Sequence, residues 1–103
     1  MIFDILTICP QAVKPYFEEG IIKRAQKNKL IEINLRNIRD YTVDKHRVVD
    51  DSPYGGGPGM VIKIEPIWKC LQGINNVKLS AKNNKTKIIL LSPRGKLFDQ
   101  SMA

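Results

Sequence analysis

The segment DDSPYGGGPGM, residues 50–60, contains the residue types with which a chain approaches a flat or anionic ligand through its backbone. It holds four glycines and two prolines in eleven positions. Successive glycines let several backbone N–H groups converge on an anion, or let a base lie against the chain. Pro53 and Pro58 would stiffen such a loop, and the ring of Tyr54 can stack on a base or ribose. The alternative is a mobile tether of the same composition.

Two common nucleotide-binding motifs do not fit this segment. A triphosphate-binding loop ends in Gly-Lys-Ser or Gly-Lys-Thr, whereas this one runs Gly57-Pro58-Gly59-Met60. A dinucleotide-binding fingerprint needs a different glycine spacing and an acidic residue after the next strand. The glycines therefore predict a ligand contact without identifying the ligand.

A charged run, DKHR, precedes the glycines and contains the single histidine, His46. A histidine can transfer protons near neutral pH. The carboxylates of Asp44, Asp50 and Asp51 can bind Mg²⁺ through their oxygens. Carboxylates in such turns more often accept hydrogen bonds from backbone N–H groups, and we favour that interpretation.

The composition is that of a globular chain of one domain. The 103 residues are 43% hydrophobic and 26% charged, and no apolar run approaches the ~18 residues of a membrane span. The apolar opening carries Asp4 and no basic residue before it, so we expect a cytoplasmic protein without membrane contact. Cys9 and Cys70 lie far apart, and we expect both to be buried free thiols.

The formal net charge of +7 favours polyanionic partners such as nucleic acid. Much of the excess lies in KLSAKNNKTK, residues 78–87, which is typical of a solvated loop. The charge alone therefore identifies no partner.

Hydrophobic periodicity predicts alternating strands and helices around these segments. The predicted strands cover residues 2–8, 30–36 and 86–92; the predicted helices cover residues 13–29 and 64–73. In the first helix the apolar residues recur every fourth position and form one face, at Val13, Phe17, Ile21 and Ala25, and Gly20 marks a break. In the second helix we expect Trp68 to lie in the core. Asp99 is placed to cap a further helical turn.

This order of elements predicts an α/β fold with a parallel sheet, in which residues 86–92 form a central strand covered on both faces. Ligands of such sheets bind outside the carboxyl ends of the strands. The glycine segment follows the second predicted strand, and LSPRG, residues 91–95, forms a turn after the third. We therefore expect both loops to meet at one site, with Gly95 in a conformation that larger residues resist.

The segment RDYTVDKHRVVDDSPYGGGPGM, residues 39–60, closely resembles the signature of the bacterial tRNA (guanine-N1)-methyltransferases of the TrmD type. ILTICPQ, EPI and LSPRGKLFDQ extend the resemblance over the whole chain, in the expected order and at the expected separation. That family uses S-adenosylmethionine to methylate the guanosine that lies 3′ of the anticodon.

The resemblance implies a SPOUT-type α/β fold with a deep trefoil knot, acting as a homodimer with tRNA as substrate and S-adenosylmethionine bound in the knot. It assigns one wall of the cofactor pocket to Leu91, Ser92, Pro93 and Gly95. It places Tyr54, Gly55, Gly56, Gly57, Pro58 and Gly59 close to the cofactor and target base. We assign His46 and Arg47 to loop anchoring or to contact with tRNA phosphates.

In that family the catalytic Asp and Arg, the knot crossing and the tRNA-binding domain all follow the segment that matches here. The chain therefore reads as the N-terminal portion of the cofactor-binding domain, residues 1–103, with the knot region and the C-terminal tRNA-binding domain absent. No catalytic residue can be assigned in it. We expect these 103 residues alone to show neither methylation nor specific cofactor binding.

Two other classes of function stay open at this point. A non-enzymatic, basic RNA-binding module agrees with the net charge, although no RRM, KH or OB signature is visible. A scaffold without a ligand is the other class, and in it the glycine segment is only a linker.

Overall fold

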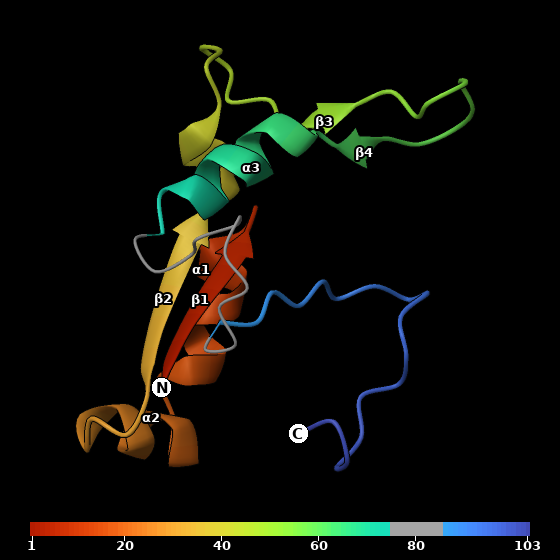
Figure 1. Cartoon of the computed structure of the whole chain (residues 1–103). Coiled ribbons are helices and arrows are strands. Elements are labelled where there is room, and N and C mark those ends of the chain that lie inside the picture. The colour runs from red at the N-terminus through yellow and green to blue at the C-terminus, as the bar shows by residue number, and fades with distance from the viewer. Residues whose placement is uncertain (75–85) are drawn as a thin grey trace.

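The computed structural model describes residues 1–74 and 86–103 (Figure 1). The predicted loop at 78–87 lies outside the described residues except for its last two positions. In chain order the elements are β1 (Ile2–Thr7), α1 (Pro10–Val13), the 3₁₀ helix η1 (Lys14–Phe17), α2 (Gly20–Lys27), β2 (Glu32–Asn37), the 3₁₀ helix η2 (Ile38–Tyr41), β3 (Asp50–Asp51), β4 (Val61–Ile62) and α3 (Ile64–Gln72).

Strands β1 and β2 form a parallel pair, which confirms the α/β class and the first two predicted strands. Their register runs from Ile2 opposite Glu32 to Thr7 opposite Asn37. Parallel strands need a crossover connection, and the helical segment between them supplies it (Figure 1). The Nε of Arg36 donates to Asp4 Oδ1 at 2.9 Å, which ties the two strands near their middle.

The helical segment is interrupted at Gly20, as predicted, because this residue has a φ of +65°. The break ends η1 and starts α2, so the segment is not one continuous helix. Of the four positions predicted to form one apolar face, Val13, Phe17 and Ala25 are half-buried. The prediction for Ile21 is wrong, because its side chain is 78% exposed and its neighbour Ile22 is half-buried instead. The four-residue spacing assumed an unbroken helix, and the turn at Gly20 changes which residue points inward.

Helix α3 packs against η2, and a small core lies around this contact. Among the described residues, Ile38, Val49, Cys70 and Ile74 are buried hydrophobic residues. The predicted stripe on α3 is confirmed, because Cys70 is fully buried and Ile67 and Leu71 are half-buried. Gly73 ends the helix, as predicted.

The prediction that Trp68 lies in the core is wrong, because its side chain is 47% exposed. Two residues along a helix correspond to about 200° of rotation, so Trp68 faces away from the side that buries Cys70. Both cysteines are free, but only Cys70 is buried, and Cys9 is exposed. Cys9 lies in the short connection between β1 and α1.

Residues 86–92 do not form the predicted central strand. They lie in an irregular segment in which Ile88, Leu90 and Leu91 are 60%, 87% and 91% exposed (Figure 1). A strand needs backbone partners, and a continuous apolar strand also needs cover on both faces; the described residues provide neither here. Asp99 does cap a turn, because its Oδ1 accepts hydrogen bonds from Ser101 and from the backbone N–H of Met102.

In the described part of the chain, no helix is both long enough and apolar enough to cross a membrane.

Candidate functional site

The glycine segment forms the tip of a β-hairpin. β3 and β4 pair antiparallel, with Asp50 opposite Ile62 and Asp51 opposite Val61. The N–H of Lys63 donates to the carbonyl of Val49 at 2.6 Å and closes the root of the hairpin. Figure 1 shows the hairpin projecting away from the strands and helices. The sequence does not predict this hairpin, because its two-residue strands are too short to show an alternating pattern.

Every glycine at the tip has a positive φ, between +79° at Gly55 and +115° at Gly57. A Cβ added at any of these glycines would meet no heavy atom of the described residues within 4 Å. Glycine is therefore required here by the backbone conformation and not by crowding within this chain. The side chain of Tyr54 is fully exposed, and the N–H of Gly56 donates to the carbonyl of Pro53 at 3.1 Å. The tip thus presents backbone groups and one aromatic ring to solvent.

A tight turn at residues 44–47 precedes the hairpin. The N–H of Arg47 donates to the carbonyl of Asp44 at 3.2 Å, and the N–H of Val48 donates to Asp44 Oδ2 at 3.0 Å. The second bond lowers the pKa of Asp44, because it stabilises the charged carboxylate. Asp51 accepts a similar bond from the N–H of Ser52 at 2.8 Å. These contacts confirm the capping interpretation for Asp44 and Asp51.

Among the described residues, no group of three or more His, Cys, Asp or Glu side chains could hold a metal ion. His46 lies at the exposed corner of the turn.

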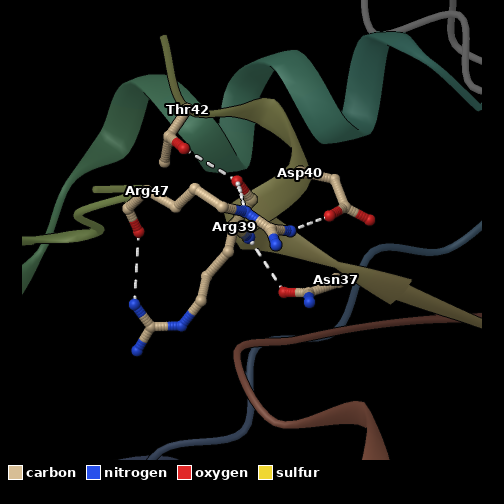
Figure 2. A network of polar contacts seen from close by, with 5 residues as sticks. All are labelled: Asn37, Arg39, Asp40, Thr42 and Arg47. Atoms are coloured by element: carbon tan, nitrogen blue, oxygen red, sulfur yellow. Dashed lines mark hydrogen bonds and ion pairs between the residues drawn. The ribbon is translucent and has the colours of Figure 1, made fainter. Parts of the chain in front are cut away.

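Arg47 anchors this turn to η2 (Figure 2). Its guanidinium contacts the carboxylate of Asp40, and its Nε donates to the carbonyl of Arg39 at 3.4 Å. In return, Nη1 of Arg39 donates to the carbonyl of Arg47 at 3.2 Å. These contacts are of the kind that the loop-anchoring role proposed for Arg47 requires. Asp40 and Arg39 were missed, because their contacts join positions seven and eight residues apart within an aperiodic segment.

Two hydrogen bonds fix the start and the end of η2 in the same network. Asn37 Oδ1 accepts from the N–H of Arg39 at 3.0 Å, and the Thr42 hydroxyl donates to the carbonyl of Arg39 at 2.7 Å (Figure 2). An Asn two residues before its partner is a common turn former, so this part of the network had a sequence signal.

The LSPRG segment forms the predicted turn. The N–H of Gly95 donates to the carbonyl of Ser92 at 3.0 Å, and the N–H of Arg94 donates to the Ser92 hydroxyl at 3.2 Å. The φ of Gly95 is not positive, so the backbone conformation does not by itself restrict this position to glycine. A Cβ there would lie 3.2 Å from the carbonyl oxygen of Ser92, which is a tight contact. Leu91, Ser92, Pro93 and Gly95 are all exposed.

The two loops do not meet in the described part of the chain. In Figure 1 the hairpin tip and the blue segment that carries residues 91–95 lie well apart. A hollow of about 40 Å³ lies instead between the 41–48 segment and the first turns of α3, and Lys63 and Lys69 are among its lining residues. A volume of this size suits a few water molecules and not a nucleoside. The described residues alone therefore do not bring the hairpin tip and the LSPRG turn together into the predicted site.

Comparison with known proteins identifies the family. The family model described as tRNA (Guanine-1)-methyltransferase TrmD matches residues 1–103. The chain belongs to this family. Two curated TrmD relatives, each named tRNA (guanine-N(1)-)-methyltransferase, are similar over all 103 residues: one from Koribacter versatilis is 46% identical, and one from Thermomicrobium roseum is 50% identical. The chain covers 39% and 37% of these two proteins, so it spans about two fifths of their length.

A solved TrmD structure shows the same fold in part. The crystal structure of tRNA (m1G37) methyltransferase from Aquifex aeolicus superposes with a TM-score of 0.65 at 40% sequence identity. The match covers 70% of this chain and 32% of that chain. The α/β architecture with its parallel strand pair is thus shared with a TrmD enzyme, and the resemblance drawn from the motifs is confirmed.

Proposed function

We propose that this chain is part of an enzyme that transfers a methyl group from S-adenosylmethionine to N1 of the guanosine 3′ of the tRNA anticodon. The observation that carries the proposal is the TrmD family match over every residue of the chain. Relatives that are 46–50% identical and bear the name of this activity support it. Those relatives are longer than this chain, so the activity is proposed for the intact protein.

The cofactor side of the site is assigned to the turn formed by Leu91, Ser92, Pro93 and Gly95. The turn fits this role, because its own hydrogen bonds hold it together while Leu91 and Pro93 expose apolar surface that an adenine can cover. When bound, S-adenosylmethionine supplies the electrophilic methyl group. The residues of the turn bind and orient it.

The substrate side is assigned to the hairpin tip, comprising Tyr54, Gly55, Gly56, Gly57, Pro58 and Gly59. Its exposed backbone groups can approach the edge of a base, and the ring of Tyr54 can stack on a base or ribose. Arg47 anchors the loop, and His46 is exposed and can face a phosphate. Transfer also requires removal of the guanine N1 proton, and we assign that task to no residue described here.

Residues 1–103 are proposed to be the N-terminal portion of the cofactor-binding domain. Ile88, Leu90 and Leu91 expose adjacent apolar side chains, and such a patch normally packs against further protein. A knot formed with further protein, and a homodimer, would supply this cover and bring the two loops together. A tRNA substrate would place the enzyme in the cytoplasm.

The test is methylation of an unmodified tRNA transcript by the intact protein with S-adenosylmethionine. We expect 1-methylguanosine, identified by mass spectrometry of the nucleosides, from a transcript with guanosine 3′ of the anticodon. A transcript with adenosine at that position is the control and should give none. RNA binding without any methylated product would contradict the proposal and favour the non-enzymatic RNA-binding module.

A further inference from the structure

The polar contacts at the root of the hairpin point to a role that goes beyond holding the turn together. We propose that Arg39, Asp40 and Arg47, here called the root clamp, fix the direction in which the hairpin presents its glycine tip. Asp40 and Arg47 are then positioning residues for the methyl transfer. The catalytic part of this inference rests on the proposed function; the structural part does not.

The root clamp joins two segments that no strand pairing connects in residues 1–74 and 86–103. Arg39 and Asp40 lie on η2, which continues directly from β2, whereas Arg47 lies on the turn that leads into β3. The two arginines exchange hydrogen bonds, since each side chain donates to the main-chain carbonyl of the other. Asp40 adds an ion pair to the guanidinium of Arg47 (Figure 2). Rotation of the turn relative to η2 would break all three contacts together.

The backbone of Arg47 adopts a conformation that is uncommon for a residue with a side chain. Its φ is +54°, a left-handed conformation that Gly or Asn adopts at lower cost. Among the described residues, the other non-glycine with a positive φ is Lys29. Lys29 directly follows the end of α2, where helices commonly adopt this conformation. Arg47 has no helix end to explain it, and strain of this kind clusters where a side chain has a task.

The hairpin is held chiefly at its root, so contacts there determine where its tip lies. Val49 is fully buried two residues after Arg47, and its carbonyl accepts the hydrogen bond from Lys63 that closes the root. Beyond this point, the hairpin has two paired positions on each strand and the turn bond at Gly56. A small rotation at the root is therefore amplified at Tyr54 and the glycines.

The root clamp contributes little to global stability, because its ion pair is exposed. The side chains of Arg47 and Asp40 are 51% and 60% exposed, and exposed pairs stabilise a fold only weakly. Its removal should consequently alter the presentation of the loop without unfolding the protein. This difference separates a positioning role from a purely structural one.

The first test uses amide hydrogen exchange in the intact protein without substrate. Asp40→Asn keeps the shape of the side chain and removes its charge. The matched control is Glu18→Gln. It removes the carboxylate of the exposed ion pair between Lys14 and Glu18, which lies before β2 in the chain and outside the root clamp. We expect Asp40→Asn to accelerate exchange of the Lys63 amide about threefold or more with an unchanged melting temperature, and the control to leave it unchanged. Unaltered exchange in Asp40→Asn would overturn the root clamp.

The second test measures steady-state methylation of the tRNA transcript. Arg47→Lys retains the positive charge and the main-chain carbonyl, but its single ammonium group cannot bind Asp40 and the carbonyl of Arg39 in the two directions that the guanidinium uses. We expect Asp40→Asn and Arg47→Lys each to lower kcat about tenfold, with KM for tRNA within about twofold, and the double variant to be no worse than either single one. Asp40→Glu should restore part of the loss, because it can rebuild the ion pair.

Binding of a tRNA phosphate by Arg47 is the alternative role, and the kcat of Asp40→Asn distinguishes the two. Phosphate binding predicts that Asp40→Asn leaves kcat unchanged, since it only frees the guanidinium. It also predicts that a variant without the charge, Arg47→Gln, reduces the salt dependence of tRNA binding by about one ion. That result would overturn the positioning role. A wild-type protein that produces no 1-methylguanosine would refute the proposed function, and the exchange experiment would still decide whether the root clamp orients the hairpin.

Discussion

Substitution of Gly56 by asparagine, alanine and valine tests why the hairpin tip is built from glycine. The φ of Gly56 is +80°, and a Cβ there would have free space around it. An L-residue in the left-handed region costs roughly 1–2 kcal/mol, and Asn tolerates this region better than other side chains. At about 1.4 kcal/mol per factor of ten, alanine should reduce the equilibrium constant for forming the native loop roughly 5- to 30-fold. Valine should reduce it further, because its Cβ is branched.

The assay is kcat/KM for 1-methylguanosine formation by the intact protein, with the melting temperature as a control. We expect activity to decrease in the order Gly, Asn, Ala, Val, with melting temperatures close to the wild-type value, because the exposed tip buries little surface. The reasoning would be refuted if the alanine variant were more active than the asparagine variant. Activity would then follow side-chain size, and close approach of a ligand would be the reason for the glycine.

Three further predictions concern groups away from the tip. Burial raises the pKa of the Cys70 thiol, so iodoacetamide should label Cys9 within minutes and Cys70 only after denaturation; peptide mapping that finds both labelled in the native protein would contradict the packing of α3. The hydrogen bond from the Val48 amide lowers the pKa of Asp44, so this bond stabilises the turn fully above pH about 3.8, the ordinary carboxyl pKa, and is lost as the pH falls through the lower pKa of the folded state. The NMR signal of the Val48 amide should show this titration, and Asp44→Asn should abolish it. Arg36→Met removes a half-buried, charge-assisted bond between the strands and should lower the free energy of unfolding by about 1–3 kcal/mol in urea, whereas no change would show that the bond is dispensable.

The parts of the fold that the sequence predicts are those with local causes. Alternation of apolar and polar residues predicted β2, the cap-like pair Glu65-Pro66 predicted the start of α3, and Gly20 predicted a break that its positive φ explains. The strand expected at residues 86–92 depends on partners elsewhere, and an apolar run cannot indicate whether those partners are present.

In the candidate site, too, the sequence predicts the features with local causes and misses those that depend on tertiary contacts. The glycines at the tip were predicted from composition alone, because the backbone conformation they permit is a property of each residue. The contact of Asp40 with Arg47 depends on how an aperiodic segment folds back on itself, and no periodicity reports that. Similarly, the separation of the two loops reflects tertiary contacts that the order of elements does not specify.

The central claim is that the hairpin tip and the LSPRG turn, apart in this structure, belong to one methyl-transfer site. Hydrogen–deuterium exchange of the intact protein, alone and with S-adenosylmethionine and tRNA, tests it most directly. We predict that residues 91–95 become protected on addition of the cofactor and that residues 52–60 become protected when tRNA is added as well. Unchanged exchange at residues 52–60 in a complex that is actively methylating tRNA would contradict the account.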